Sequence, residues 1–377
     1  MRLAVCLYKF FPFGGLSRDF VRIMDALLTT EDTVDVFCIE WQGDVPPQFN
    51  ITLISAKGYS NHSKLMSFQC QLMPYLQSGA YDLVLGFNKM PGLDLYYAAD
   101  PCYIDRLKSY RLYPLLRFSP RVRFYSACEQ AVFGTESDTV SLMISDVQQA
   151  LFKQHYGTPD SRLLALPPGI DPQRRRPDNA AAIRQHKRKE LGIEDDEWLL
   201  LMVGTGFKTK GVDRSIAAVS QLADNYKKQV RLLIAGDGDS QKWRTQAKNS
   251  GVDRQLTFLG GRSDITELLL AADLLLHPAR KENTGTVILE AMVAGLPVLV
   301  SDVCGYAKYV ITADAGLLLD RPDDAERMAR QIETMLEPKR LKYWSEQALQ
   351  YAAVEDLYSM PEKAAQVIRR MAQEKRG

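Results

Sequence analysis

Two glutamates, Glu282 and Glu290, stand eight positions apart in one stretch of the chain. Glu282 begins a polar turn through Asn283, Thr284 and Gly285, and Glu290 lies in an apolar run that predicts a helix. A helix start offers free backbone N–H groups and a positive dipole end, which together bind a phosphate. A carboxylate two turns further on can accept hydrogen bonds from the vicinal hydroxyls of a ribose. The stretch therefore predicts a nucleotide site.

An ordinary amphipathic helix could use the same two glutamates. Glu282 would then be a first-turn partner of the helix dipole, and Glu290 would be solvated. The stretch alone leaves both interpretations open.

A second loop carries two lysines, Lys208 and Lys210, between Gly204 and Gly211. It follows a predicted strand, so its backbone donors and ammonium groups can bracket a diphosphate. The spacing is not that of a Walker P-loop, and Thr209 stands where a dinucleotide fingerprint has its third glycine. An NAD-dependent dehydrogenase on the same fold is therefore disfavoured.

Further polar residues follow strands in the first half of the chain. Gly14 and Gly15 come after the first strand, with Asp19 in the helix behind them. Asn88, Lys89 and Asp100 follow later apolar runs, and ligands of open α/β sheets collect at such strand ends. A polar loop without a function is the alternative for these positions.

The elements that hold these loops alternate between short apolar runs and helical patterns, and the alternation restarts after residues 167–169, Pro-Pro-Gly. We therefore predict an α/β chain with parallel sheets in two domains, 1–168 and 169–355, followed by a C-terminal helix in 356–377. The Gly204, Glu282 and Gly305 loops should lie at the carboxyl ends of strands in one sheet.

Residues 103–133 mix arginines with aromatic side chains and contain few acids. Such a segment suits a membrane surface, where aromatics lie at the interface and arginines meet anionic headgroups. Pro114 and Pro120 interrupt any single long helix, so a basic segment that packs its leucines internally is the alternative.

Composition sets limits on the class of protein. The 377 residues are 46% hydrophobic and 25% charged with a net charge of +1, which argues for a globular protein and against a nucleic-acid binder. Six cysteines show no paired spacing, and we expect free, buried thiols. With no secretory leader and no apolar run of about 18 residues, we expect a cytoplasmic protein that at most lies on the inner face of a membrane.

The motifs resemble a known family. The order of the glycine loop at 14–15, the loop at 204–211 and the pair Glu282 and Glu290 is similar to that of retaining GT-B glycosyltransferases of the glycosyltransferase family 4 type. More narrowly, five strings resemble the lipopolysaccharide core glucosyltransferase I family of Gram-negative bacteria: Leu7–Gly15, Gly86–Asp94, Leu289–Leu299, Val303–Tyr306 and Asp356–Pro361.

The resemblance implies two facing Rossmann-like domains with a cleft between them. The first would bind the acceptor and the second the nucleotide sugar, with the last helix crossing back to the first. Glucose would pass from UDP-glucose, with retention, to a heptose of the lipopolysaccharide inner core, in outer-core biosynthesis. No metal or other cofactor is implied.

The resemblance also assigns residues. Glu290 matches a ribose-binding glutamate, Glu282 the glutamate near the donor sugar, and Lys210 a phosphate-binding lysine. Backbone contacts to the diphosphate and sugar fall on Asn283, Thr284 and Gly285, and Gly14, Gly15 and Gly204 belong to the matching glycine loops. Thr205 replaces an arginine of many relatives, so Lys208 is a candidate for the second positive charge. Asp100 replaces a histidine, and with Asp19 it is a candidate catalytic acid.

Other functions stay open at this point: a related transferase that uses another UDP-sugar or another lipid-linked acceptor, or a non-catalytic module that binds sugar nucleotides. The sequence does not choose the donor sugar, because a single hydroxyl contact decides it. It also leaves the acceptor hydroxyl and the oligomeric state open.

Overall fold

A computed structural model describes residues 1–12, 14–29, 31–78, 81–319 and 321–376. The chain divides into unit 1, Met1–Gly169 with Tyr358–Gly377, and unit 2, Ile170–Leu357. The first boundary lies one residue after the expected 168 and the second two residues after the expected 355. Each unit has its own sheet and its own hydrophobic core.

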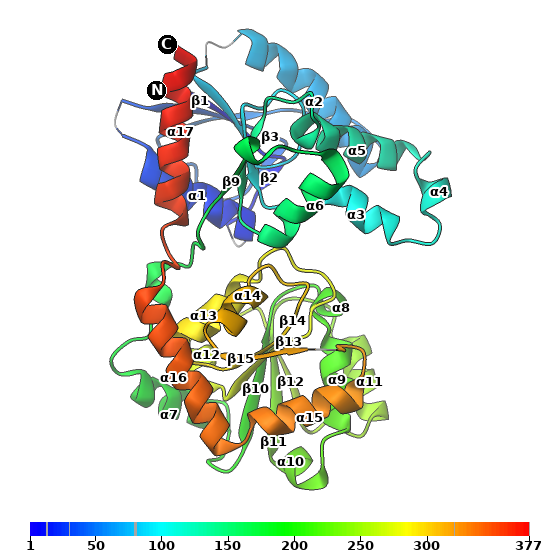
Figure 1. Cartoon of the computed structure of the whole chain (residues 1–377), viewed down its shortest axis with the longest axis vertical. Helices are drawn as coiled ribbons and strands as arrows, with labels where there is room; N and C mark the ends of the chain where they lie inside the picture. The colour runs from blue at the N-terminus through cyan, green and yellow to red at the C-terminus, as the bar shows by residue number, and fades with distance from the viewer. Residues whose placement is uncertain (13, 30, 79–80, 320, 377) are drawn as a thin grey trace. The chain divides into compact units, whose positions relative to one another are not determined.

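Unit 1 is built on a seven-stranded parallel sheet in the order β5-β3-β1-β6-β7-β8-β9 (Figure 1). The strands are β1 (Arg2–Cys6), β3 (Thr33–Cys38), β5 (Phe49–Leu53), β6 (Leu83–Gly86), β7 (Leu95–Ala98), β8 (Val140–Met143) and β9 (Leu163–Ala165). A two-stranded parallel pair, β2 (Lys9–Phe10) and β4 (Glu40–Trp41), stands beside it.

Helices cover both faces of this sheet. They are α1 (Gly15–Leu27), α2 (Asn61–Ser78), α3 (Tyr103–Lys108), α4 (Tyr113–Leu116), α5 (Pro120–Phe133), α6 (Asp146–Tyr156), the 3-10 turn η1 (Asp160–Arg162) and α17 (Met360–Arg376). The final helix α17 packs along α1 (Figure 1), which returns the end of the chain to unit 1 as expected.

Unit 2 is built on a six-stranded parallel sheet in the order β12-β11-β10-β13-β14-β15 (Figure 1). The strands are β10 (Trp198–Val203), β11 (Val230–Ala235), β12 (Leu256–Gly260), β13 (Leu274–His277), β14 (Val298–Ser301) and β15 (Gly316–Leu319). Its helical elements are η2 (Pro172–Arg174), α7 (Ala180–Glu190), α8 (Phe207–Lys210), α9 (Val212–Ser220), α10 (Asp224–Gln229), α11 (Gln241–Asn249), α12 (Ile265–Ala271), α13 (Thr286–Ala294), α14 (Ala307–Thr312), α15 (Ala325–Met335) and α16 (Pro338–Val354).

The apolar runs form the central strands because a parallel sheet that is covered on both faces buries nearly every side chain. All of β13 and β14 is buried, and so are the four residues after Trp198 in β10. The loops at Gly204, Glu282 and Gly305 follow β10, β13 and β14, so all three lie at the carboxyl edge of one sheet, as predicted.

Four short strands, β2, β4, β7 and β15, were not predicted. Each spans only two to four residues, so none gives a period long enough to recognise. The prolines behave as expected: Pro114 lies in the first turn of α4 and Pro120 begins α5, so residues 103–133 form three helices instead of one.

The cysteine prediction holds for five thiols and is wrong for Cys70. All six are free, but Cys70 lies exposed on α2 because its position faces away from the sheet. None of the helices within the described ranges has the length and apolar character needed to cross a membrane.

Candidate active site

Lys210 and Glu282 meet at the carboxyl edge of the unit 2 sheet. The Lys210 ammonium forms an ion pair with Oε2 of Glu282. His277, the last residue of β13, places Nε2 at 3.3 Å from the same oxygen. Lys210 and Glu282 are 72 positions apart in sequence, and the parallel pairing of β10 with β13 brings them together.

The charges of this cluster are fixed by its surroundings. Burial raises the pKa of Glu282, but the hydrogen bond with His277 and the charge of Lys210 outweigh it and lower that pKa to about 2. Burial, together with the Lys210 charge, lowers the pKa of His277 despite the opposing effect of Glu282. A neutral His277 then donates its Nε2 hydrogen to an ionised Glu282, because a carboxylate can only accept.

Glycines allow the Lys210 loop to lie against the Glu282 turn. A Cβ atom on Gly204 would stand 2.8 Å from Cε of Lys210, and one on Gly211 would stand 2.1 Å from the carbonyl oxygen of Pro278. Both glycines have positive φ, at 140° and 78°, which disfavours other residues. Lys210 therefore reaches Glu282 across a loop that leaves room for it.

Arg280 fixes the two loops to each other. Its guanidinium forms two hydrogen bonds with the carboxylate of Asp213, at 2.7 and 2.8 Å, and its backbone N–H donates to the carbonyl of Thr209 at 2.8 Å. A bidentate pair of this kind fixes orientation as well as distance.

The start of α13 presents unpaired donors. Gly285 precedes the helix with φ at 83°, and within the described residues the backbone N–H groups of Thr284, Gly285 and Thr286 have no acceptor. The N–H groups of Gly305 and Tyr306 donate to the carbonyls of residues 283 and 284 and hold the turn in place. This arrangement can receive an oxyanion.

Glu290 is mostly buried on α13, where Oε1 lies 3.8 Å from Nε of Arg174 in η2. The carboxylate oxygens of Glu290 are of the kind that accept hydrogen bonds from hydroxyls. Glu290 is therefore not the solvated glutamate of the alternative interpretation. Glu282 is not an ordinary first-turn partner of the helix dipole either, because it pairs with Lys210 and His277.

Two further residues of the predicted phosphate loop, Thr205 and Lys208, are exposed. The Lys208 ammonium forms no ion pair in the described part of the chain, and its carbonyl accepts from Arg280 at 3.1 Å. Lys208 is thus positioned beside the cluster without belonging to it, and its phosphate role stays a prediction.

In unit 1, Asp19 lies near the start of α1, and its Oδ2 accepts a hydrogen bond of 2.8 Å from the hydroxyl of Tyr97. Burial raises the pKa of Asp19 to about 6, against the opposing effects of Tyr97 and two nearby arginines. A Cβ on Gly14 would clash with the Phe11 ring, whereas Gly15 faces open space. Gly14, Gly15 and Asp19 thus share one end of α1.

Asp100 lies on the other face of the same sheet. Its Oδ2 is 3.5 Å from the hydroxyl of Tyr96, and successive residues of a strand point to opposite faces, so Asp19 and Asp100 are not brought together. Asn88 accepts the backbone N–H of Tyr8 at 2.8 Å. Lys89 is buried in an ion pair with Glu129, so its charge is not available to a ligand.

Sequence reasoning missed His277, Arg280 with Asp213, and Arg174. His277 ends an apolar run and gives no signal of its own. Arg280 lies 67 positions from Asp213, so only the paired strands show that they meet.

Comparisons with known proteins agree with this architecture. Residues 183–351 match the family described as glycosyl transferases group 1. Lipopolysaccharide glucosyltransferase WaaG of Escherichia coli strain K12 is 41% identical over 369 residues, which cover 98% of each chain.

Solved structures are similar as well. The crystal structure of WaaG, a glycosyltransferase involved in lipopolysaccharide biosynthesis, aligns with a TM-score of 0.89 at 40% identity over 97% of this chain and 99% of that one. Anabaena Alr3699/HepE in complex with UDP-glucose aligns at 0.74 over 99% and 100% of the two chains, but at 17% identity it supports the fold alone. The predicted GT-B fold is confirmed.

Proposed function

Because the chain belongs to the glycosyltransferase family that includes lipopolysaccharide glucosyltransferase WaaG, we propose that it transfers glucose from UDP-glucose to a heptose of the lipopolysaccharide inner core, with retention at C1. The observation that carries the proposal is the meeting of Lys210, Glu282 and the start of α13 at one edge of the unit 2 sheet. Unit 2 then binds the donor and unit 1 the acceptor.

The donor fits the charges of unit 2. The diphosphate takes the free N–H groups at the start of α13 and the Lys210 ammonium, and the ribose hydroxyls donate to Glu290. Breaking the sugar–phosphate bond builds negative charge on the leaving phosphate, and a cation placed there stabilises the transition state.

Glu282 serves as a fixed negative charge near the sugar. Its carboxylate is already engaged by Lys210 and His277, which makes it a poor nucleophile. The acceptor hydroxyl then attacks from the side of the leaving phosphate, which takes the proton as the new glycosidic bond forms. Configuration at C1 is retained without a covalent enzyme intermediate.

The test is transfer from a set of UDP-sugars to deacylated core oligosaccharide that ends in heptose. We expect UDP-glucose to be used at least tenfold better, by kcat/KM, than UDP-galactose or UDP-N-acetylglucosamine. If the protein neither hydrolyses nor transfers any of these UDP-sugars, it is a binding module and not a transferase. If it prefers another sugar, the proposed donor is wrong.

We further propose that the reaction needs no metal or other cofactor, since Lys210 and backbone donors supply the positive charge at the diphosphate. Enzyme treated with EDTA and assayed without added cations should keep its full turnover. A loss that Mg²⁺ or Mn²⁺ restores would contradict this.

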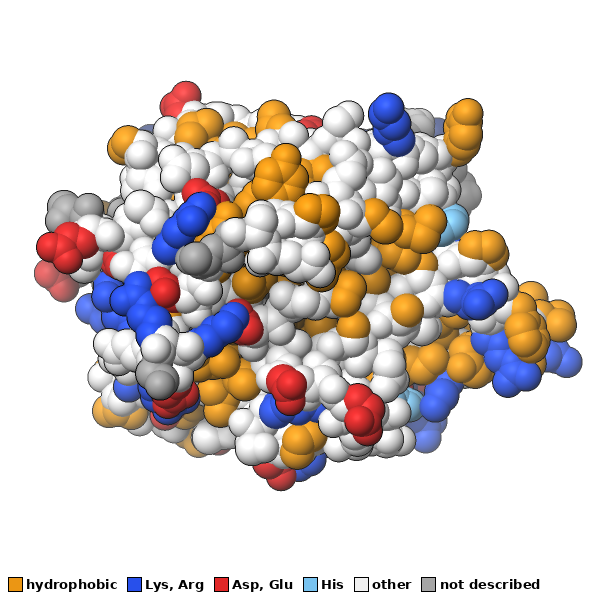
Figure 2. Space-filling view, turned by 90° about the horizontal axis from the view of Figure 1, so that it is seen from above, with side chains coloured by type: hydrophobic (Ala, Val, Ile, Leu, Met, Phe, Trp, Pro, Cys, Tyr) orange, Lys and Arg blue, Asp and Glu red, His pale blue; other side chains and the backbone are white. Residues whose placement is uncertain are grey.

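We also propose that the α3–α5 lobe, residues 103–133, lies on the anionic inner face of a membrane, so that the protein is cytoplasmic and peripheral. Three large apolar side chains on and beside α4 are strongly exposed: Leu112 at 61%, Leu115 at 72% and Phe118 at 67%. Arg111, Arg117, Arg121 and Arg123 are exposed around them. In Figure 2 orange and blue side chains gather on a projection at the right-hand edge, where Figure 1 has α4.

These side chains suit a bilayer surface, because apolar groups enter the interface and each basic contact with anionic lipid contributes about 1 kcal/mol. Replacing Arg117 and Arg123 by Glu should lower binding to vesicles with 30% phosphatidylglycerol at least tenfold, and high salt should do the same to the unmodified protein. Vesicle binding that is indifferent to both changes would contradict the proposal.

A further inference from the structure

We infer that a pocket between α3 and α5 of unit 1 binds an anionic sugar of the acceptor, one that carries a carboxylate or a phosphate, through Arg106 and Arg121. The inference rests on the proposed function and adds to it a residue-level acceptor site. The hollow has a volume of about 340 Å³, which lies in the range of pockets for small ligands.

The pocket lies at the carboxyl edge of the unit 1 sheet, where ligands of such sheets bind. Asn88 and Asp100 enter it from the loops after β6 and β7, and the walls are formed by Tyr103 and Arg106 of α3 with Arg121 and Tyr125 of α5. Aromatic rings with a carboxylate and an amide are the groups that receive a sugar ring and its hydroxyls.

Both arginines are available to a ligand. Within the described residues neither Arg106 nor Arg121 forms an ion pair or a hydrogen bond with an acid. Each instead stands over an aromatic ring of the same pocket, Arg106 at 5.1 Å from the centre of Tyr103 and Arg121 at 6.0 Å from that of Tyr125. Stacked guanidinium groups keep their donors free for a carboxylate or phosphate.

The two guanidinium groups act on the same point. Burial raises the pKa of Tyr103, and the charges of Arg106 and Arg121 both oppose that rise. The same two arginines oppose the rise in the pKa of Tyr125. The ring centres of Tyr103 and Tyr125 lie 5.3 Å apart, and each ring has one of the two arginines against it. Two cations from different helices therefore face the same pair of tyrosines, which suits one anionic group.

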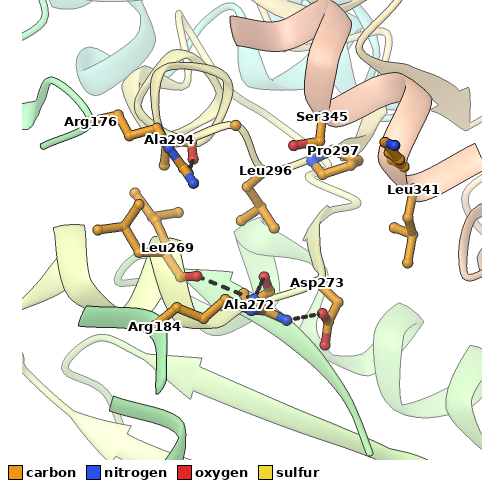
Figure 3. A pocket seen from close by; sticks show the side chains of 13 residues that line it. Arg176, Arg184, Leu269, Ala272, Asp273, Ala294, Leu296, Pro297, Leu341 and Ser345 are labelled. Atoms are coloured by element: carbon orange, nitrogen blue, oxygen red, sulfur yellow. Dashed lines mark hydrogen bonds and ion pairs between the residues drawn. The ribbon is translucent and has the colours of Figure 1, made fainter. Parts of the chain in front are cut away.

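Arginines that line a hollow are often structural, and unit 2 contains such a case (Figure 3). There Arg184 donates to the carbonyls of Leu270, Ala271 and Ala272 and pairs with Asp273, while Arg176 donates to the carbonyl of residue 294. These guanidinium groups satisfy the carbonyl ends of α12 and α13, so their donors are already used within the fold. In the part of the chain that the structure describes, Arg106 and Arg121 have no such partners.

A saccharide fits the pocket better than a lipid headgroup. Of the four wall residues, Tyr103, Arg106 and Tyr125 are half-buried and Arg121 is exposed, whereas the residues of α4 that suit a bilayer stand out into solvent. Asp100, which lines the pocket, can accept hydrogen bonds from the hydroxyls of a sugar ring.

The buried side chain of Glu129 fixes the position of α3. The buried carboxylate of Glu129 accepts the backbone N–H groups of Tyr103 and Ile104 at 2.8 and 3.1 Å and the hydroxyl of Tyr156 at 2.8 Å, and it pairs with Lys89. The wall that carries Arg106 is thus held in place before a ligand binds, which favours a formed site.

The test compares Arg106→Gln and Arg121→Gln with Arg370→Gln, an exposed arginine of α17 in the same unit. The acceptor is deacylated heptose-terminated core oligosaccharide, used intact, carboxyl-reduced or dephosphorylated, and its binding is also followed by calorimetry. We expect each pocket variant to raise KM and Kd for the intact acceptor about tenfold, the scale of one charge-assisted hydrogen bond. Hydrolysis of UDP-glucose should stay at the unmodified rate, and Arg370→Gln should change nothing.

The three acceptor forms identify the anion. If carboxyl reduction removes the difference between the pocket variants and the unmodified enzyme, the ligand group is a carboxylate, and if dephosphorylation removes it, a phosphate. The inference is overturned if KM for the intact acceptor is unchanged in both variants, or if neither treatment alters the difference. It is also overturned if Arg106→Gln weakens vesicle binding as Arg117→Gln does, without any effect on the acceptor.

Failure of the proposed function would look different. An unmodified enzyme that hydrolyses UDP-glucose but does not transfer to the intact core oligosaccharide refutes the heptose acceptor. If the unmodified enzyme and both pocket variants transfer glucose equally well, only the proposed acceptor pocket is refuted.

Discussion

Two regions of the molecule differ in how their charged side chains are paired. One is the donor edge of unit 2, formed by the Gly204, Glu282 and Gly305 loops, and the other is the α3–α5 lobe of unit 1. At the donor edge Lys210 pairs with Glu282, and Arg280 pairs with Asp213. In the lobe Arg106 and Arg121 have no acid partner within the described residues, and large apolar side chains are exposed. Paired charges hold a fixed geometry, whereas unpaired cations are open to an anion from outside. The two regions thus suit chemistry and recognition respectively.

The lobe should depend on one buried carboxylate more than on any of its exposed residues. Glu129→Ala leaves the Lys89 ammonium buried without its partner and removes the acceptor for three donors, so we expect a loss of about 3–5 kcal/mol in the free energy of unfolding of unit 1. Urea unfolding measures it. Replacing exposed Glu136 by Ala is the control, and equal effects would show that Glu129 does not anchor α3.

At the donor edge the largest effect should fall on turnover. Lys210→Ala and Glu282→Gln should each lower kcat about 100-fold or more, the scale for removing a group that stabilises the transition state, while the fold is kept. Lys227→Ala on α10 is the matched control. Turnover at the unmodified rate in either variant would remove that residue from the mechanism.

The donor edge could be predicted because its motifs lie beside strands that the apolar runs reveal. Glu282, Lys210 and Gly285 each follow an apolar strand or precede an apolar helix, so their common edge follows from parallel pairing. His277 could not be found in this way, because a histidine at the end of an apolar run looks like any other buried residue.

The pocket in the lobe could not be predicted either. Arg106 and Arg121 stand on two helices separated by a proline-broken turn, and no periodicity indicates that they converge. Asp19 and Asp100 were grouped as acids of one site, yet the alternation of Tyr96 and Tyr97 along β7 sends them to opposite faces.

A smaller effect on binding should separate the ribose contact from catalysis. Glu290→Ala removes the acceptor for the ribose hydroxyls, so we expect the Kd for UDP to rise about tenfold. Calorimetric titration with UDP measures it, with Glu326→Ala on the exposed face of α15 as the control. An unchanged Kd would contradict the ribose assignment.

A further effect should appear as a dependence of stability on pH. Burial raises the pKa of Asp19 from 3.8 to about 6, so the free-energy cost of ionising it in the folded protein is absent below pH 4, grows between pH 4 and pH 6 and is complete above pH 6. Asp19→Asn should therefore stabilise the protein by up to about 3 kcal/mol at pH 7.5 and by nearly nothing at pH 4. Urea midpoints at the two pH values measure this gain. If Asp25→Asn, at an exposed position, gives an equal gain at pH 7.5, the burial of Asp19 is not its cause.

The most direct test of the division between chemistry and recognition is one kinetic series with UDP-glucose and deacylated heptose-terminated core, run on the unmodified enzyme, Lys210→Ala and Arg106→Gln. The account predicts that Lys210→Ala lowers kcat about 100-fold with an acceptor KM within twofold of the unmodified value. It predicts that Arg106→Gln raises the acceptor KM about tenfold and leaves the hydrolysis of UDP-glucose unchanged. If both variants alter the same kinetic constant, or if no glucose reaches the heptose in any of them, the account is contradicted.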